Sequence, residues 1–173
     1  DKVFVVSGLR YFLRLSDNLH GEEYLEELVQ HHISGQLKVA PEHTQPDVLA
    51  RMRKPDTGKL LEFKDRFEAI NKAVGKKQFL SYYLIAAYPG CTLGDMQALK
   101  RFASRELGVL PDQVQVFTPT PSTYASVMYY TEKDPFTGEK LFVEKNPAGK
   151  KQQKETITGR NQPPRRHRKK GKG

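Results

Sequence analysis

The chain has 173 residues, of which 37% are hydrophobic, so it is long enough to enclose one core and too apolar for a disordered protein. It contains neither a signal peptide nor the run of about 18 to 20 apolar residues that a membrane helix needs, so we expect a cytoplasmic protein without membrane contact. The single cysteine, Cys91, excludes a disulfide framework and a cysteine-ligated metal cluster built from this chain alone.

The positive charge is concentrated at one end of the chain. The formal net charge is +9, but residues 145 to 173 hold eleven Lys or Arg against the single acid Glu155, which leaves a net charge of −1 for residues 1 to 144. We therefore predict a nearly neutral body, residues 1 to 145, and a basic tail, residues 146 to 173, that is disordered in isolation. The folded part is expected to end between residues 145 and 158.

Strand and helix patterns alternate along the body. Short apolar or β-branched runs that end in polar or turn residues predict four buried strands: Val3 to Ser7, Gln36 to Ala40, Gln78 to Ala87 and Gln113 to Thr118. Three- and four-residue spacing of apolar side chains predicts helices between them: Glu22 to Ile33, a short helix that starts near Thr44 or Pro46, Leu60 to Ala73, and one capped by Thr92 that ends at Gly108.

This order predicts an α/β fold with a parallel sheet and right-handed crossovers, in a barrel-like or doubly wound arrangement. Four strands are too few to close a barrel. After Thr118 the pattern becomes irregular, with several prolines and a short helix or strand near Lys140 to Glu144.

Functional groups in parallel α/β proteins gather at the carboxyl ends of the strands. The segments that follow the four predicted strands are rich in Pro, Gly, small and hydroxyl residues: Ser7 to Tyr11, Lys38 to Thr44, Ala86 to Thr92 and Phe117 to Thr123. Any one of them alone is consistent with an ordinary turn. Four together predict a ligand site at this edge of the sheet.

The order of these segments resembles the YgiQ-type radical S-adenosylmethionine (SAM) proteins over residues 1 to 145. The resemblance is carried by Val6-Ser7-Gly8-Leu9-Arg10-Tyr11, Pro41-Glu42-His43-Thr44, Leu49-Ala50-Arg51-Met52-Arg53-Lys54-Pro55, the run from Tyr83 to Thr92, the run from Gln113 to Pro121, and Met128-Tyr129-Tyr130. Their collinear order is more specific than any one motif.

The resemblance implies a partial (β/α)6 TIM-like barrel that binds a [4Fe-4S] cluster and SAM and cleaves SAM to a 5′-deoxyadenosyl radical. In that family a C-x-x-x-C-x-x-C loop after the first strand holds the cluster. This chain would supply the last four β/α units, strands three to six, so the cluster loop would precede Asp1. Because Cys91 does not match that loop, we expect the chain to be a fragment that is inactive alone.

The resemblance also assigns roles to residues of this chain. Glu42 matches the acid near which the polar groups of SAM bind, although it would also serve as a helix cap. Pro89 and Gly90 would lie along the adenosine. Ser7 and Arg10 would meet the SAM carboxylate or an anionic substrate, unless Arg10 is a surface residue. His43 and Pro119 are weaker candidates, because a histidine at a helix start is more often a structural hydrogen-bonding residue.

Two other functions remain open from the sequence. The first is a nucleic-acid-binding module that contacts phosphates nonspecifically through residues 159 to 173, a segment without aromatic residues for base stacking. The second is an interaction domain with no ligand, in which Glu42 and Arg10 are dispensable and the open edge of the sheet associates with another surface. The sequence does not distinguish the substrate or the reaction class.

Overall fold

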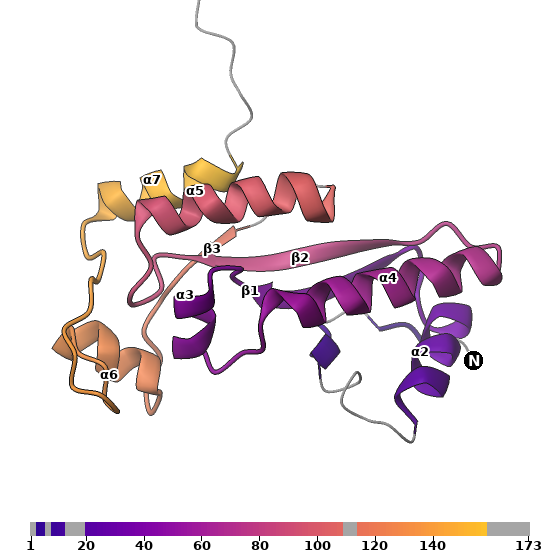
Figure 1. The fold of residues 1–173 in the computed structure, drawn as a ribbon, viewed down its shortest axis with the longest axis horizontal. Helices are drawn as coiled ribbons and strands as arrows, with labels where there is room; N and C mark the ends of the chain where they lie inside the picture. The colour runs from indigo at the N-terminus through magenta and orange to yellow at the C-terminus, as the bar shows by residue number, and fades with distance from the viewer. Residues whose placement is uncertain (1–2, 6–7, 13–19, 109–113, 159–173) are drawn as a thin grey trace, which may run out of the picture.

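A computed structural model of the chain describes residues 3–5, 8–12, 20–108 and 114–158. The described helices and strands follow one another in Figure 1 in this order: α2 (Gly21–His31), β1 (Gln36–Glu42), α3 (Pro46–Arg51), α4 (Thr57–Ala73), β2 (Phe79–Ala86), α5 (Leu93–Phe102), η1 (Ala103–Leu107), β3 (Val114–Val116), α6 (Tyr124–Thr131) and α7 (Pro147–Thr158).

The strands form a parallel three-stranded sheet in the order β1-β2-β3. Leu37 pairs with Leu80 and Leu84 with Val114, and the register between β1 and β2 shifts between Val39 and Glu42. The mixed α/β class and three of the predicted strands are thereby confirmed. The sheet is open, and the predicted partial barrel stays a prediction.

The first predicted strand is wrong in the residues that the structure describes. Val3, Phe4 and Val5 are not in a strand, and Val5 instead donates its backbone N–H to His32 O at 2.9 Å. The parallel contact with β1 comes later, where Leu9 forms an isolated bridge with Val39. An apolar run shows that a segment can be a strand, but it does not fix which of its residues pair with the neighbour.

Two clusters of buried residues fill one face of the sheet. Leu80 and Tyr82 of β2 pack with Phe63 and Phe67 of α4 and with the apolar side of α2. Leu84 and Ala86, which have the same parity on β2, pack with Met96 and Leu99 of α5 and with Ile157 of α7. The α4 and α5 helices therefore cover the same face of β2, as right-handed crossovers between neighbouring parallel strands require.

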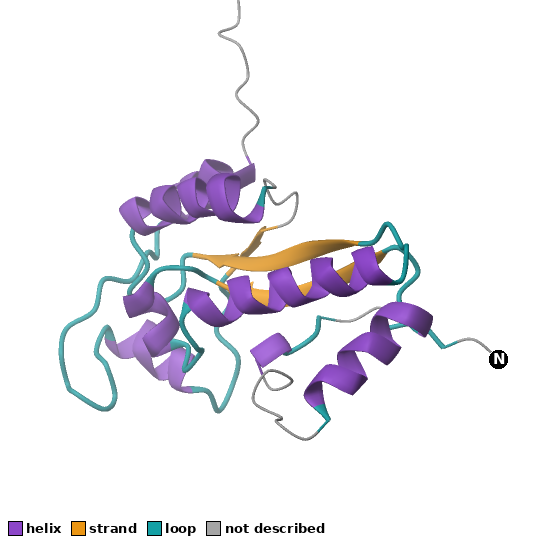
Figure 2. Ribbon diagram, turned by 45° about the vertical axis from the view of Figure 1, so that its right-hand side comes forward, coloured by secondary structure: helices purple, strands orange, loops and turns teal. Residues whose placement is uncertain are grey.

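The opposite face of the sheet is less covered by the described elements. The alternate residues of β2 are exposed or half-buried: Phe79, Ser81, Tyr83 and Ile85. Figure 2 shows the loops gathered at one end of the sheet, the end to which β1 and β2 run. The carboxyl ends of the strands therefore meet the connecting segments at a single edge.

The α5 helix begins as the sequence predicts. Thr92 and Asp95 form a capping box, in which each side chain accepts a hydrogen bond from the backbone N–H of the other. After Phe102 the helix widens into the π-helical turn η1 and ends at Gly108, whose φ of 66° is in the left-handed region that glycine tolerates.

The C-terminal segment adds two helices that the sequence pattern did not reveal. The α6 helix follows the proline-rich stretch after β3, and α7 lies within the residues assigned to the basic tail. In Figure 1 α7 lies alongside α5, and its Ile157 is buried there. Near Lys140 to Glu144 the structure has only a bridge between Lys133 and Lys140. No helix in the described part of the chain is long and apolar enough to cross a membrane.

Candidate functional site

The backbone changes direction sharply where β1 and β2 end. Glu42 has a φ of 65° and Ala87 a φ of 58°, so both residues are in the left-handed region although neither is glycine. This conformation costs about 1–2 kcal/mol for a residue with a side chain, and such residues cluster at ligand sites. The strand ends are therefore held in shape by their surroundings, as a preorganised site requires.

The Glu42 side chain forms an ion pair at this edge. Its carboxylate lies 2.9 Å from Lys54 Nζ, and the two side chains are 25% and 13% exposed. Lys54 Nζ also donates a hydrogen bond to Ala40 O at 2.8 Å, so the ammonium is held against the C-terminal end of β1. This half-buried pair presents one negative and one positive group side by side.

Two buried tyrosines lie within the electrostatic reach of Glu42. Burial first, and then the charges of Asp56 and Glu42, raise the pKa of Tyr11 to about 12. Burial and Glu42 likewise raise the pKa of Tyr88 to about 12, against an opposing effect of Arg51. Both phenols therefore stay protonated at neutral pH and can act as hydrogen-bond donors.

The segment 87–91, which joins β2 to α5, carries the Pro89-Gly90 motif. Gly90 has a φ of 85°, and a Cβ at this position would lie 2.9 Å from Cδ and Nη1 of Arg51. Tyr88 Oη donates to Arg51 O at 3.3 Å. Pro89 is buried and Gly90 is half-buried. The structure thus brings Pro89 and Gly90 beside α3, with the Arg51 guanidinium packed on the glycine.

Replacement of Gly90 by alanine is expected to lower the free energy of unfolding by about 1–2 kcal/mol or more, because φ strain adds to the contact with Arg51. Gly75→Ala is the matched control, since Gly75 has a φ of 66° but no heavy atom within 4 Å of an added Cβ. Urea unfolding of both variants measures the difference. Equal losses would mean that packing of Arg51 on Gly90 contributes nothing.

His43 and Cys91 meet beneath this edge in a fully buried cluster. His43 Nδ1 accepts a hydrogen bond from the Gln45 backbone N–H at 3.0 Å, and His43 Nε2 lies 3.5 Å from Cys91 Sγ. Burial lowers the pKa of His43 to about 4 and raises the pKa of Cys91 to about 12. Both groups are neutral at physiological pH and have no contact with solvent.

Gln153 of α7 completes the buried cluster. Its Oε1 accepts the backbone N–H of Ala87 at 2.9 Å, and its Nε2 donates to Cys91 O at 3.1 Å. Gln153 is 1% exposed. A residue 62 positions after Cys91 thus fixes both ends of the 87–91 segment.

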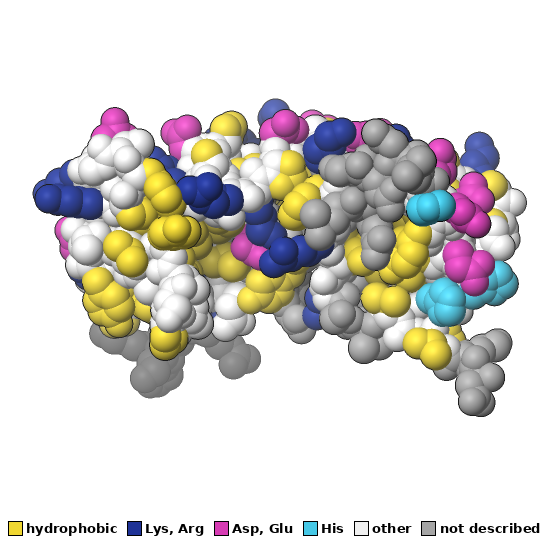
Figure 3. All heavy atoms as spheres, turned by 90° about the horizontal axis from the view of Figure 1, so that it is seen from below, with side chains coloured by type: hydrophobic (Ala, Val, Ile, Leu, Met, Phe, Trp, Pro, Cys, Tyr) yellow, Lys and Arg dark blue, Asp and Glu magenta, His cyan; other side chains and the backbone are white. Residues whose placement is uncertain are grey.

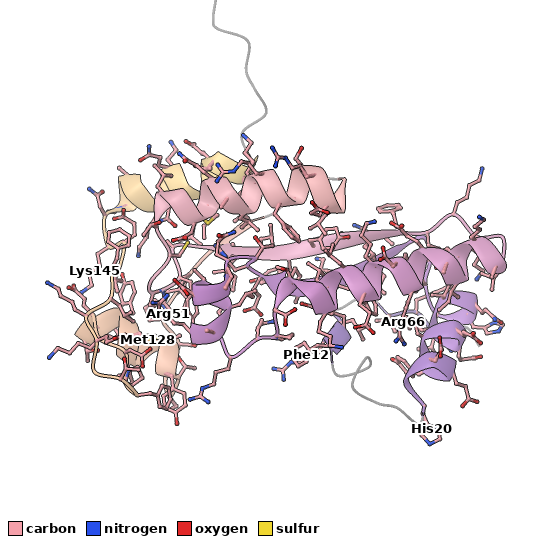
Figure 4. The ribbon with its side chains drawn as sticks, viewed as in Figure 1. Phe12, His20, Arg51, Arg66, Met128 and Lys145 are labelled. Carbon is pink, nitrogen blue, oxygen red and sulfur yellow. The ribbon has the colours of Figure 1, made fainter. Side chains whose placement is uncertain are left out.

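A cleft of about 400 Å³ opens next to Arg51, between α3 and the segment around α6. In Figure 4 Arg51 and Met128 are labelled on these two elements, and both line the cleft. Arg53 lies over the Phe136 ring at 4.3 Å. Figure 3 shows hydrophobic side chains gathered at the α6 end of this face, which agrees with the exposure of Tyr124 and Phe136.

The remaining predicted site residues lie apart from this cluster or outside the described residues. Arg10 is exposed, one residue after the bridge that joins Leu9 to Val39, and Pro119 is half-buried three residues after β3. Ser7 and the tail 159–173 lie outside the described residues, so their predicted roles, including nucleic-acid contact, stay predictions.

The described residues do not fit a [4Fe-4S] cluster, but the strand ends fit a polar ligand. They contain no group of three His, Cys, Asp or Glu that could hold a metal, and the buried, protonated Cys91 is not a ligand thiolate. Thr44 Oγ1, two residues after Glu42, is buried without a hydrogen-bond partner among the described residues. An unsatisfied polar atom in the segment that follows β1 is the kind of group that a ligand satisfies.

Several residues of this edge had no role in the sequence prediction. Arg51 and Lys54 lie inside the run that carries the resemblance, yet their spacing alone does not show that one packs on Gly90 and the other pairs with Glu42. Tyr88 directly precedes the predicted Pro89, but its position in the sequence does not show that its hydroxyl donates to Arg51 O. The burial of Gln153 could not be predicted from the sequence, because a glutamine in a polar, lysine-rich segment is expected to be exposed to solvent.

Comparison with known proteins places this chain among longer relatives. Residues 112–169 match the model of a domain of unknown function, DUF3362. The chain is 58% identical over 157 residues to a UPF0313 protein of Fusobacterium nucleatum subsp. nucleatum, a match that covers 91% of this chain and 28% of that protein.

Two further relatives come from other organisms. The identity is 47% over 159 residues to a UPF0313 protein of Methanosarcina mazei, of which 25% is covered, and 43% over 155 residues to one of Thermotoga petrophila, of which 27% is covered. The matches include 92% and 90% of this chain, respectively. The chain thus spans about a quarter of the length of the curated relatives it matches. Over about nine-tenths of its length this chain is therefore similar to UPF0313 proteins.

Proposed function

We propose that this chain is the later part of a YgiQ-type radical SAM enzyme and that its strand-end edge binds the amino acid part of SAM. The observation that carries the proposal is the Glu42–Lys54 ion pair at the end of β1, half-buried and 2.9 Å across. Its place at the carboxyl ends of parallel strands is where α/β folds bind their ligands.

The charges of this pair are complementary to a free α-amino acid group. Glu42 would accept hydrogen bonds from an ammonium, and Lys54 would donate to a carboxylate. In the structure the two side chains satisfy each other, and Ala40 O anchors Lys54 Nζ from the other side. A zwitterion inserted at the pair would replace one ion pair by two, so that each of the four charges would have a partner of opposite sign, as partly buried charges require.

The neighbouring residues would shape the rest of the site. Tyr88, whose pKa Glu42 helps to raise, is followed directly by the buried Pro89 and the half-buried Gly90, and an aromatic ring system would pack along this segment. When bound, a [4Fe-4S] cluster would supply the electron that cleaves SAM. Its cysteine ligands would have to come from residues that precede this segment in the longer protein, because Cys91 is buried and protonated.

The less covered face of the sheet supports the same proposal. In this segment the side of β2 that carries Ser81, Tyr83 and Ile85 is only half-buried, while helices fill the other side. Further strands of the longer protein would continue the sheet beside β1, where Leu9 already pairs with Val39, and would enclose that face. The relatives, which are about three to four times as long, have the residues to do so.

The test is SAM binding and reductive SAM cleavage by the full-length enzyme after anaerobic cluster reconstitution. Glu42→Gln is expected to weaken SAM binding about 10- to 100-fold, the worth of a hydrogen bond to a charged group, and to slow dithionite-dependent formation of 5′-deoxyadenosine. Glu62→Gln is the matched control, because Glu62 forms surface ion pairs with Lys59 and Arg66 on α4, away from the strand ends.

Two results would contradict the proposal at different points. If the folded enzyme assembles no cluster or releases no 5′-deoxyadenosine, the radical SAM assignment is wrong. If the enzyme is active but Glu42→Gln binds SAM as tightly as Glu62→Gln does, the amino acid part of SAM binds elsewhere.

A further inference from the structure

We propose that the C-terminal helix α7 is a working part of the strand-end site, in which Gln153 acts as a positioning residue for the 87–91 segment. The inference rests on the proposed function, because Pro89 and Gly90 are the residues assigned to SAM. Its structural half, that Gln153 fixes this segment, is testable without any ligand.

The first support is the pattern of hydrogen bonds to the segment. Gln153 accepts the Ala87 N–H and donates to Cys91 O, at 2.9 and 3.1 Å. Between these two points the Gly90 N–H donates to Phe142 O at 2.7 Å. The C-terminal segment therefore binds the 87–91 segment at its start, its middle and its end.

The second support is the backbone conformation that these bonds hold. Ala87 has a φ of 58° and Gly90 a φ of 85°. A left-handed alanine is unfavourable by about 1–2 kcal/mol and persists only where the surroundings fix it. The group that receives the Ala87 N–H is the Gln153 amide, so this side chain offsets the strain at the residue where β2 turns toward Pro89.

The third support is that the buried residue Gln153 is polar, although an apolar residue at this position would suffice to pack α7 on the core. Gln153 and Ile157 lie one helical turn apart on α7 and are both buried, at 1% exposure. Ile157 packs in the core with Leu84, Ala86 and Leu99. Burying an amide is favourable only if its hydrogen bonds are made, so a glutamine here specifies the geometry of its partners more than it adds to stability.

The test uses Cys91, the only cysteine in the sequence, as a reporter of how often the 87–91 segment opens. The full 173-residue chain is treated with 4,4′-dithiodipyridine and the modification rate is followed by absorbance. Because Cys91 is fully buried beside Gln153, loss of the amide bonds is expected to raise the rate in Gln153→Met by about tenfold, equivalent to about 1.4 kcal/mol.

Two variants on the same helix separate positioning from general stability. Ile157→Ala loosens α7 by removing core contacts and leaves the amide bonds in place. Gln152→Met makes the same chemical change at the neighbouring exposed position. We expect Cys91 in Gln153→Met to react faster than Cys91 in Ile157→Ala, under conditions where the two variants have equal free energies of unfolding. In Gln152→Met it is expected to react at the rate of the protein without substitutions.

The conservative variant Gln153→Glu provides a rescue that depends on pH. When protonated, the introduced carboxyl group accepts through its carbonyl oxygen and donates through its hydroxyl, as the amide does, whereas the ionised carboxylate has no donor and is buried. The other titratable groups facing this position are His43, Cys91 and Asp95, and they are common to both proteins. The ratio of the Cys91 modification rate in Gln153→Glu to that in the protein without substitutions should therefore be near one at about pH 5 and rise about tenfold by about pH 8.

The outcomes discriminate clearly. A faster Gln153→Met than Ile157→Ala at equal stability, with rescue of Gln153→Glu at about pH 5, supports the positioning role. Equal rates for Gln153→Met and Ile157→Ala, or a Gln153→Glu ratio that does not change with pH, would overturn it. The thiol results can support the positioning role while Gln153→Met leaves the SAM affinity of the full-length enzyme unchanged. In that case Gln153 still positions the 87–91 segment, but the link between this segment and SAM is wrong.

Discussion

Replacement of Phe63 by alanine is expected to lower the free energy of unfolding by about 3–5 kcal/mol, the range for a large core side chain. Phe63 is fully buried on α4, with its ring 5.7 Å from Tyr11 and 6.5 Å from Phe67, centroid to centroid. Phe63 belongs to the core cluster that also contains residues of α2, β1 and β2, so the cavity left behind cannot collapse without moving α4. Urea unfolding followed by circular dichroism measures the loss.

The control for this prediction is Phe142→Ala, which deletes the same side chain where it is half exposed and should cost less than about 1 kcal/mol. A loss this large at Phe63 is comparable with the total stability of a small domain. If the alanine variant does not fold, Phe63→Leu is expected to retain the fold with a smaller loss. A loss below about 1 kcal/mol at Phe63 would contradict the placement of α4.

The second large effect is a loss of stability in acid caused by His43. Burial lowers the pKa of His43 to about 4, against an ordinary value of 6.5, so between these values the unfolded chain binds the proton more tightly. Stability from this residue is therefore complete above pH 6.5 and falls as the pH drops toward 4. The shift corresponds to about 3 kcal/mol at its limit.

His43→Asn isolates the contribution, because an asparagine oxygen can accept the Gln45 N–H as His43 Nδ1 does but does not titrate. We expect the difference in unfolding free energy between the two proteins to change by about 3 kcal/mol between about pH 7 and about pH 4. Carboxylates that titrate in this range are common to both proteins and cancel. A constant difference would show that His43 is accessible to solvent.

The elements that the sequence predicted well are those with strong local signals. Thr92 caps α5 and Gly108 ends its π-helical extension, because the capping box and the left-handed glycine are decided within one turn. The first strand was misplaced since pairing of Leu9 with Val39 depends on a register that no local pattern encodes. Helix α7 was missed for a related reason: its mean composition is polar, and only Gln153 and Ile157 are buried.

In the candidate site, too, the residues with a local sequence signal were predicted, and those that reach the site only through tertiary contacts were not. The segments that contain Glu42, Pro89 and Gly90 were predicted because they follow apolar runs, and the resemblance singled out these three residues within them. The structure places all three at the edge where the strands end. Their partners were not found, because Lys54 and Gln153 come from other elements and meet the site through tertiary contacts alone. The left-handed backbone of Glu42 and Ala87 was also invisible, since neither residue type favours it.

The long separation between Gln153 and its partners also sets the order in which this region is completed during synthesis. The ribosome releases the chain from its N-terminus, so β2 and α5 emerge while the residue that clamps them, 62 positions after Cys91, is still to be made. Until then the Ala87 N–H and Cys91 O lack their final partner, and water or a chaperone must satisfy them. Completion of the strand-end edge is therefore a late step in the folding of this protein, and a chain that stopped before residue 153 would lack both Gln153 hydrogen bonds to the 87–91 segment.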